Sequence, residues 1–565
     1  MQRRGQVLTD IQHGGHVLED DSARAHELAK TLETFTLAAD AVGDGEVTFQ
    51  TAFDYLFLDL VDDDAAHLPA NDPPAIVAAL KALGDAMVEQ TAPVGGVLQP
   101  TGNSTIPPVY TYWGQFIDHD LTANTDRKSE VGDITDNDLK PLAPSFVVKN
   151  LKNLRQPTLN LDSVYGDGPT FDPANPTRAG SFYDGVRFKL GRAATQTFTG
   201  DAIPGERVPP DNDLERDLPR VNLTAQIADA RNDENLIIAQ FHTAFLRFHN
   251  AVVNWVEANE PASAGSAEQL FARAQQLTRW HYQWLVVHDY LKTVTRAGIP
   301  DQILLGRPKH YAPRNGEPFM PLEFSVAAYR FGHTMVRAAY DHNRNFGRPG
   351  EILEFADFNL LFLFTGKGQP PFGGATDALP FNWIIEWDRF IDKGSSIPDH
   401  FARKIDTILA PPLSDLVNEG NGTAMPIQQI LKRLARRNLL RGYLLSIPTG
   451  QSVAREMGVA ALSADELRQG NSDALNQVLE ANGFLERTPL WFYVLKEAEV
   501  RANGNSLGEL GSRLVCETII GQLLNDSDTF LNAAGGWNPG NGVRLPNGDL
   551  IVTIADFIRF AGVLP

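Results

Sequence analysis

The chain has 565 residues, of which 43% are hydrophobic and 9% aromatic, a composition typical of a globular protein with a large core. Its formal net charge of −21 argues against nucleic acid or an anionic membrane surface as the main partner. No apolar run approaches the roughly 20 residues that a membrane-spanning helix needs.

The chain has a single cysteine, Cys516, which excludes intrachain disulfides and cysteine-based metal clusters. The residues around it predict an amphipathic helix, so we expect a buried structural thiol and not a nucleophile. The basic start Met-Gln-Arg-Arg is not followed by an apolar segment, so we expect no conventional signal peptide. These features favour a cytoplasmic protein or one exported by a non-classical route, and they do not indicate the oligomeric state.

In chain order, residues 1–95 combine helical stretches with an acidic segment, and we expect an N-terminal extension packed on the main body. Residues 125–225 are rich in Asp, Pro, Gly and Asn and predict long loops. From residue 232 the apolar spacing predicts one long half-buried helix through Trp255. Strand signals are few and short, and further helices are expected around 266–292, 323–340, 427–445, 463–482 and 507–524.

The run from Trp113 to Asp120 combines an amide, an imidazole and two carboxylates on one predicted helix. Gln115 and His119 are four residues apart, so they share a helix face and can point into one cavity. Asp118 and Asp120 project elsewhere, where they could hold a cofactor or a metal. The alternative is a solvated acidic helix end.

A second segment, Asp229 to Asn235, precedes the long helix. Arg231 offers a fixed positive fork that could stabilise a developing oxygen anion, and Glu234 could face the same site. The alternative is helix capping by Asn232 to Glu234. Capping does not require an arginine, so Arg231 is the informative residue.

The third segment places His333 beside Gly332 in an apolar helical stretch. Gly332 weakens a helix by roughly 1 kcal/mol relative to alanine, a cost that makes sense if a bulky planar group must approach the backbone. Asn438, in a fourth segment, could accept a hydrogen bond from the outer nitrogen of His333, as partners of metal-ligating histidines do. The alternative for His333 is a hydrogen-bonded core histidine.

These four segments, in this order, resemble the animal-type haem peroxidases of the peroxidase–cyclooxygenase superfamily, a myeloperoxidase-like family, here of its bacterial-type branch. The run at 113–120 is similar to the distal helix of the family. Other stretches are similar to the next helix, the proximal helix and the C-terminal region: 241–250, 329–334, 507–515 and 519–526. The resemblance spans about residues 105–560. It implies a mainly α, large helical peroxidase fold with few short strands, which we assign to residues 96–565.

The resemblance implies that His119 is the distal general base, that Arg231 is its partner, and that Gln115 lines the distal cavity. It implies that His333 is the proximal iron ligand and that Asn438 is bonded to its outer nitrogen. These roles would let the enzyme reduce hydrogen peroxide through a ferryl intermediate. Because His119 must stay at least partly neutral, activity should fall at acid pH.

The family forms ester bonds to haem methyl groups at the positions of Asp118 and Glu234, so we expect a covalently attached haem b. The chloride-oxidising branch has a methionine directly after the linking glutamate, and this chain has Asn235 there. We therefore expect bromide, iodide, thiocyanate or phenols as donors, without efficient chloride oxidation.

The family also binds a calcium ion between the residue matching Asp120 and a downstream loop. Residues 158–166 look like that loop, because oxygen-bearing side chains at alternating positions suit a hard cation. The sequence departs from the family pattern because the serine expected two residues after Asp162 is Val164, and Ser163 lies one position early. The alternative is a polar turn. The calcium ligands expected are Asp120, Thr158, Asn160, Asp162 and Ser163.

Two rival functions are a fatty-acid dioxygenase of the same superfamily and a haem-bearing binding protein that has lost its activity. The dioxygenases use a tyrosine radical, and the stretch that we compare with theirs, residues 380–390, has no Tyr or His. Two histidine pairs seven residues apart lack interleaved carboxylates, so we interpret them as structural: His242 with His249, and His281 with His288.

Overall fold

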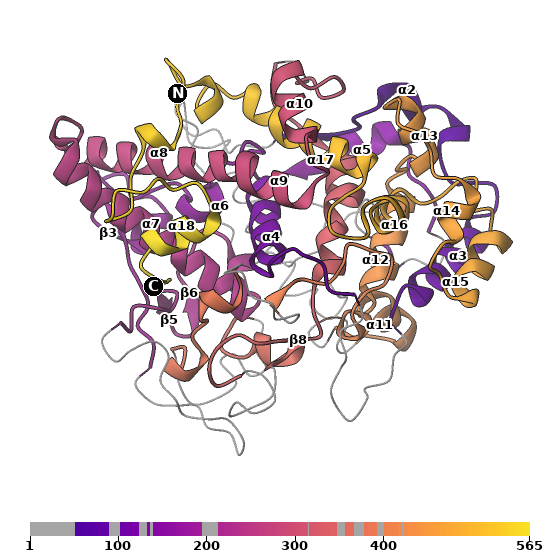
Figure 1. Cartoon of the computed structure of the whole chain (residues 1–565), viewed down its shortest axis with the longest axis horizontal. Coiled ribbons are helices and arrows are strands. Elements are labelled where there is room, and N and C mark those ends of the chain that lie inside the picture. Colours follow the sequence, from indigo (N-terminus) through magenta and orange to yellow (C-terminus); the bar gives the residue numbers. More distant parts are fainter. Residues whose placement is uncertain are drawn as a thin grey trace.

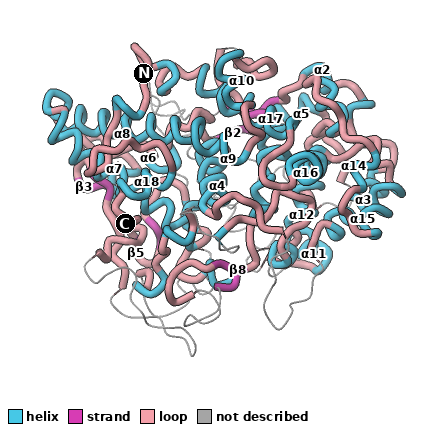
Figure 2. Tube along the Cα trace, viewed as in Figure 1, coloured by secondary structure: helices cyan, strands magenta, loops and turns pink. Residues whose placement is uncertain are grey.

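The computed structural model describes residues 51–89, 102–123, 133–135, 139–194, 213–314, 316–346, 356–366, 378–391, 400–416, 419 and 423–564. Residues 1–50 and 90–95 of the predicted N-terminal extension lie outside these ranges. Helices make up most of the described secondary structure, and the strands are only two to four residues long (Figures 1 and 2). The predicted mainly α fold is confirmed.

The α-helices are distributed along the described chain, in both its N-terminal and C-terminal halves. Among the described residues, no helix combines the length and the apolarity needed to cross a membrane. Their bounds are α2 Leu58–Val61, α3 Pro73–Ala86, α4 Val109–Leu121, α5 Pro144–Asn150, α6 Asp162–Tyr165, α7 Leu236–Asn259, α8 Ala267–Leu285, α9 Leu291–Val294, α10 Ile299–Gly306, α11 Met425–Leu431, α12 Leu434–Leu444, α13 Gly450–Glu456, α14 Ala464–Arg468, α15 Asp473–Ala481, α16 Leu490–Ala502, α17 Glu509–Leu524 and α18 Ile554–Phe560.

The strands form small sheets: β1 Thr51–Asp54, β2 Lys152–Asn153, β3 Tyr183–Asp184, β4 Arg187–Phe188, β5 Arg220–Val221, β6 Thr224–Ala225, β7 Met320–Pro321, β8 Ala339–Tyr340 and β9 Ala356–Asp357. Strand β1 lies between β2, with which it pairs antiparallel, and β7, with which it pairs parallel. Thr51 is in register with Asn153, and Phe53 with Met320. Residues 51–54 are therefore hydrogen-bonded into the main body.

Helices α4 and α7 form the centre of the core. Helix α7 begins where the side chain of Asn235 accepts a 3.0 Å hydrogen bond from the Ile238 amide, so Asn235 and not residues 232–234 supplies the N-cap. Phe116 of α4 stacks on Phe245 of α7, with ring centroids 4.3 Å apart. Figure 1 shows α7 beside α8 on one side of α4, and α12 and α16 on the other. The packing turns the opposite face of α4 towards α12.

The predicted helix at 323–340 is interrupted. Residues Glu323–Ala327 form a π turn (η7), and Ala328–Met335 form 3₁₀ turns (η8). Ala327 leaves helical geometry, with φ −126° and ψ −73°. The guanidinium Nε of Arg330 donates to the Ser325 carbonyl at 3.0 Å, which takes an acceptor that a regular α-helix would give to a backbone amide. A π turn, η6 (Val286–Tyr290), likewise interrupts the helix predicted at 266–292.

Cys516 lies in α17 with no exposed surface, which confirms the prediction of a buried thiol. Burial raises the pKa of Cys516 to about 12, so the side chain stays a neutral thiol at physiological pH. Its Sγ contacts Oγ1 of Thr295 at 3.7 Å. The residue packs as a small hydrophobic side chain between α17 and the end of α9.

Glu323 ties the β1–α2 segment to the turn that leads into η8. Its fully buried carboxylate accepts hydrogen bonds from the amides of Leu56 at 2.8 Å and Phe57 at 3.4 Å. Burial raises the pKa of Glu323 to about 7 from the ordinary 4.5, although the amides oppose the shift. The folded state therefore holds a proton that the unfolded chain releases above pH 4.5.

Replacing Glu323 with glutamine should flatten the dependence of stability on pH. Because folding raises the pKa of Glu323, this side chain stabilises the folded state fully below pH 4.5. This stabilisation, up to about 3 kcal/mol, is lost as the pH rises to about 7. Glutamine keeps an oxygen acceptor but does not ionise. Urea unfolding at pH 4.5, 6 and 8 measures the effect.

The matched control is Glu486→Gln, because Glu486 is exposed. The control should follow the wild-type pH dependence, with a free energy of unfolding within about 0.5 kcal/mol of it. Equal pH dependence in wild type and Glu323→Gln would contradict the assignment of a buried, protonated Glu323.

Candidate active site

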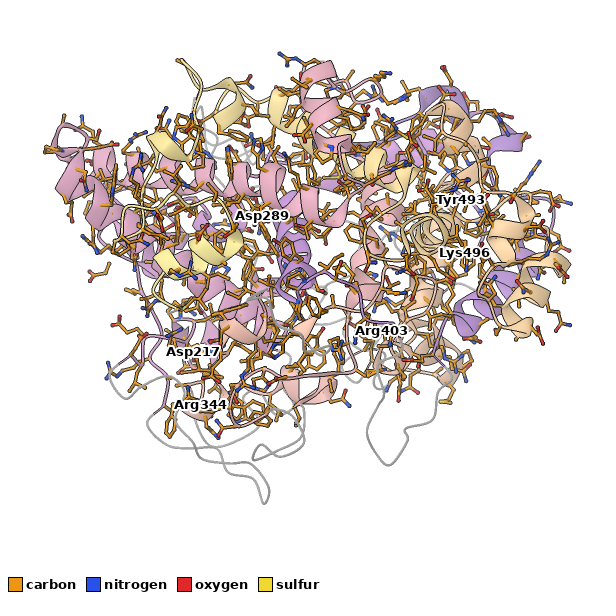
Figure 3. The ribbon with its side chains drawn as sticks, viewed as in Figure 1. Asp217, Asp289, Arg344, Arg403, Tyr493 and Lys496 are labelled. Carbon is orange, nitrogen blue, oxygen red and sulfur yellow. The ribbon has the colours of Figure 1, made fainter. Side chains whose placement is uncertain are left out.

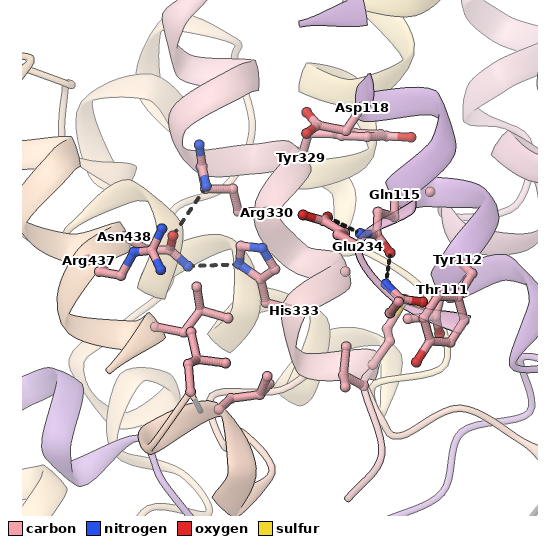
Figure 4. Close-up of a pocket in the computed structure, with 18 of the residues that line it drawn as sticks. Thr111, Tyr112, Gln115, Asp118, Glu234, Tyr329, Arg330, His333, Arg437 and Asn438 are labelled. Carbon is pink, nitrogen blue, oxygen red and sulfur yellow. Dashed lines mark hydrogen bonds between the residues drawn. The ribbon is translucent and has the colours of Figure 1, made fainter. Parts of the chain in front are cut away.

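A cavity lies between α4 and the turns around His333. Figure 4 shows Gln115 and Glu234 on one side of it, and His333 with Asn438 on the other. The chain segments that meet here are far apart in sequence: α4, the turn η4 (Ala230–Asp233) with Glu234, η8 and α12. The four motif segments of the sequence analysis therefore converge on one cavity.

Glycine makes room on the His333 side of the cavity. A Cβ added to Gly332 would meet no atom within 4 Å, so this residue borders open space. On the opposite side, a Cβ on Gly114 would lie 2.6 Å from the hydroxyl of Tyr290, so this glycine permits close packing of α4. Gly332 thus leaves a gap beside His333 that a planar group can enter.

The face of α4 that reaches the cavity carries Gln115 and Asp118, three residues apart. Gln115 Nε2 donates to Glu234 Oε1 at 2.6 Å. His119 does not line the cavity: its Nε2 lies 3.5 Å from the same Glu234 oxygen. The sequence analysis had Gln115 and His119 sharing the cavity and Asp118 projecting away. Glu234 borders the cavity in this region, and His119 is fully buried behind the lining residues.

The orientation of the His119 ring is set by Asn232. His119 Nδ1 is 2.8 Å from Asn232 Oδ1, and an amide oxygen can only accept, so Nδ1 carries the proton. Nε2 lies on the side of Glu234. The sequence analysis interpreted Asn232 only as a capping residue. Its position one residue after Arg231 was the available signal that it belongs to the site.

Arg231 is held on two sides. Its Nε and Nη2 donate to the two carboxylate oxygens of Asp229 at 3.0 and 2.7 Å, and Nη2 also donates to the His119 carbonyl at 2.8 Å. Although burial opposes the charged form, Asp229 holds the pKa of Arg231 above its ordinary value. Arg231 is therefore a fixed cation beside His119. Asp229 is a site residue that the sequence analysis did not single out.

The proximal candidates His333 and Asn438 lie side by side, but the amide presents its nitrogen to the imidazole and not the acceptor oxygen that the sequence analysis expected. Asn438 Nδ2 lies 2.9 Å from His333 Nδ1, and Asn438 Oδ1 accepts a 3.4 Å hydrogen bond from Arg330. The contact occupies Nδ1, so Nε2 is the nitrogen through which His333 would bind a metal. A half-turn of the amide presents Oδ1 to Nδ1, which a metal-bound histidine requires.

Arginines border the cavity on the side of α12, and sequence reasoning missed their role. They are Arg330, Arg437 and Arg441. The four-residue spacing of the last two on α12 was the available signal, because it places them on one helix face. A second cavity of about 560 Å³ lies beyond Asn438 and is bordered by Gly442, Tyr443 and Trp491.

The candidate calcium loop folds against the end of α4. Ser163 Oγ donates to Asp120 at 3.0 Å, and the Leu161 amide donates to Asp120 at 3.2 Å. Two buried oxygens in the loop, Thr158 Oγ1 and Asp162 Oδ1, have no hydrogen-bond partner among the described residues. Unsatisfied buried oxygens of this kind suit a hard cation.

The remaining expected ligand is less favourably placed. Asn160 Oδ1 already accepts the Asp162 amide at 3.0 Å. Burial raises the pKa of Asp120 to about 6 and that of Asp162 to about 7, and the charge of Asp120 adds to the rise at Asp162. In the described part of the chain, no group of three or more His, Cys, Asp or Glu side chains is placed to hold a metal. The loop would thus rely on two carboxylates with hydroxyl oxygens.

Three of the four paired histidines, His242, His249 and His281, are fully buried, and His288 is half-buried. His249 contacts the Tyr165 hydroxyl and the Val186 carbonyl, and His281 Nε2 accepts the Val543 amide at 3.0 Å. Burial lowers the pKa of His242 and His281 to about 3, so both are neutral. The described residues offer no third ligand to either pair.

Comparison with known proteins confirms the family resemblance. The animal haem peroxidase family model matches residues 181–358. A dual oxidase of Drosophila melanogaster is 28% identical over 110 residues, covering 20% of this chain and 7% of that protein. A peroxidase-like protein of Margaritifera margaritifera is 29% identical over 147 residues, covering 25% and 18%. Each match therefore spans less than a fifth of the relative.

Solved structures share the fold over most of the chain. Peroxidase A from Dictyostelium discoideum has a TM-score of 0.55 at 16% identity, covering 91% of this chain and 94% of that one. The fatty acid alpha-dioxygenase of Oryza sativa has a TM-score of 0.51 at 13% identity, covering 90% and 77%. At these identities the likeness establishes the fold.

Filling the gap at Gly332 should block the cavity without unfolding the chain. Gly332→Leu places a branched side chain where a planar group would lie, at a cost of about 1–3 kcal/mol, or roughly 5- to 150-fold in haem affinity. Absorbance titration of the purified chain with haemin measures the affinity, and thermal unfolding of the haem-free protein checks the fold.

Gly442→Leu is the matched control, because Gly442 also borders open space but faces the second cavity. It should leave haem affinity unchanged. Unchanged haem affinity in Gly332→Leu would show that the planar group lies elsewhere.

Proposed function

We propose that this chain, whose residues 181–358 match the animal haem peroxidase family, is a haem-dependent peroxidase that reduces hydrogen peroxide. The observation that supports it best is the cavity with a His333–Asn438 pair on one side and Gln115, Glu234 and a buried His119 on the other. An oxidoreductase of this family requires a ligand for the iron and a base near the opposite face.

The residues around the cavity fit a haem. His333 would hold the iron through Nε2, and Gly332 leaves space for the ring. The two haem propionates would find cations among the arginines of η8 and α12. When bound, the haem supplies the iron at which the oxygen–oxygen bond of peroxide is broken.

His119 and Arg231 provide the acid–base and electrostatic chemistry. With Nδ1 bonded to Asn232, Nε2 of His119 would take a proton from peroxide and return it to the departing oxygen once Glu234, 3.5 Å from Nε2, moves aside to open it to the cavity. Arg231, fixed by Asp229, supplies positive charge for the oxygen that departs. Full burial of His119 excludes bulk water from this proton transfer.

We also propose ester bonds from Asp118 and Glu234 to haem methyl groups. Both carboxylates line the cavity, which supports the assignment. Esterification would remove the negative charge of Glu234 from beside His119 Nε2, 3.5 Å away, and so favour the neutral imidazole that accepts a proton.

The small donors proposed are bromide, iodide, thiocyanate and phenols. Gln115 lines the cavity and would contact a bound water or halide. Asn235, which donates to Gln115 Oε1 at 3.3 Å, stands where the chloride-oxidising branch has a methionine. We therefore propose no efficient chloride oxidation. Calcium is proposed at the Asp120–Asp162 loop, supported by its unsatisfied buried oxygens.

Replacing His119 with glutamine should lower kcat/KM for peroxide by about 10²- to 10⁴-fold, because the proton acceptor is lost. Steady-state guaiacol and bromide oxidation by the haem-loaded chain measures the effect. His281→Gln is the control, since that histidine is equally buried but bonded to Val543. Wild-type kcat/KM in His119→Gln would exclude this base.

Acidified-acetone extraction followed by mass spectrometry tests the ester bonds. Haem should stay with the wild-type chain after peroxide treatment, and Asp118→Asn with Glu234→Gln should release it. Haem that extracts freely from the wild type would rule out the ester links while leaving the peroxidase proposal intact.

A fatty-acid dioxygenase is the second candidate. Four buried tyrosines line the cavity: Tyr110, Tyr112, Tyr290 and Tyr329. Tyr329 donates to the Tyr290 hydroxyl at 3.2 Å, so oxidisable phenols lie beside the cofactor space. Oxygen uptake with a C18 fatty acid, abolished by Tyr329→Phe, would identify this activity. Peroxide-dependent guaiacol oxidation without oxygen uptake supports the peroxidase.

A further inference from the structure

One buried arginine contacts both the candidate calcium loop and the carboxylate that holds the candidate distal pair, His119 and Arg231. Arg155 has no exposed surface. Its Nη2 donates to Asp229 at 2.5 Å, and its Nη1 lies 3.7 Å from Oδ1 of Asp162 in the loop. One guanidinium therefore faces a carboxylate of each site.

Asp229 links Arg155 to Arg231 because its carboxylate pairs with both arginines. The Oδ2 atom of Asp229 accepts from both arginines, from Arg155 at 2.5 Å and from Arg231 at 2.7 Å. Although burial opposes ionisation, the two arginines hold the pKa of Asp229 far below its usual value. The chain of charges runs without a break from Asp162 to Arg231, which contacts the backbone of His119.

The backbone of Arg155 is fixed, so any adjustment falls on its side chain. Asn153 Oδ1 accepts the amides of Arg155 and Ala123, and Asn153 Nδ2 donates to the Leu121 carbonyl. The hydroxyl of Thr51 donates to the Arg155 carbonyl at 2.8 Å. These bonds join the segment to the end of α4 and to β1.

The charges of Asp162 and Asp229 determine how strongly Arg155 is attracted to each carboxylate. The guanidinium of Arg155 places positive charge 3.7 Å from Oδ1 of Asp162, an oxygen that accepts no hydrogen bond from the described residues. A divalent cation at the loop would neutralise Asp162 and leave the charge of Arg155 to Asp229 alone. Asp229, and with it Arg231, would then be held more firmly.

We propose that Arg155 is a positioning residue that couples cation binding at the Asp162 loop to the placement of Arg231 through Asp229. This inference rests on the proposed peroxidase function. Coupling between two sites is reciprocal. A cation bound at the loop should therefore raise the affinity for a ligand that needs His119 and Arg231, and that ligand should raise the affinity for the cation. Arg155 itself touches neither the cavity nor a reacting atom.

Cyanide binding to the haem-loaded full chain tests the coupling apart from turnover, because cyanide must deliver its proton to the distal base. Removal of calcium with a chelator should slow cyanide association in the wild type by at least about fivefold, the lower end of typical coupling. In Arg155→Gln, association should be slow with or without calcium. The absorbance change of the haem reports the rate.

Two further variants separate coupling from general destabilisation. Arg403, labelled in Figure 3, is also a buried arginine, paired with Glu89 at 2.7 Å and absent from the cavity lining, so Arg403→Gln should respond to calcium like the wild type. Arg155→Lys keeps the charge but cannot reach two carboxylates with two nitrogens. It should bind haem and lose the calcium response.

The outcomes distinguish this inference from the function beneath it. A wild-type chain that binds haem and oxidises guaiacol, but whose cyanide association ignores calcium, overturns the coupling alone. A calcium response retained in Arg155→Gln or Arg155→Lys overturns the role of Arg155. A wild-type chain that binds no haem overturns the proposed function and this inference with it.

Discussion

The buried carboxylate of Asp229 is the interaction on which the site depends. A lone charge without exposed surface would cost several kcal/mol, and removing one partner of such a pair typically costs about 3–5 kcal/mol. Two arginines offset that cost, and each comes from a different part of the chain. Because Arg231 also contacts the His119 carbonyl, the same carboxylate links helix α4, Arg231 and, through Arg155, the candidate calcium loop.

The long helices could be predicted from the sequence because their apolar spacing is local. Helix α7 at 236–259 follows from apolar residues three and four apart, on a helix that packs against α4, α8 and α18. The turns at 323–335 could not be predicted in the same way. There a side chain, Arg330, takes a carbonyl that the periodic pattern assigns to the backbone, and nothing in the spacing reveals that exchange.

The candidate site was predictable where one residue type implies its partner, as with His333 and Asn438, 105 positions apart. It was not predictable where a distant residue decides between two options. The four-residue spacing allowed both Gln115 and His119 to face the cavity, and only the position of Glu234 determines which does. Arg155 lay outside the sequence prediction because its carboxylate partner is 74 residues away and no local pattern links them.

The cavity has opposite charge on its two sides, and this constrains how a haem could lie. Carboxylates come from α4 and the residue after η4, whereas the arginines come from η8 and α12. Glu419 adds one carboxylate to the arginine side, 3.8 Å from Arg437, which leaves that side net positive. A planar group with two carboxylates on one edge gains attraction only when that edge faces the arginines. The separation of charge would thus favour a haem whose carboxylate edge lies towards Arg330, Arg437 and Arg441.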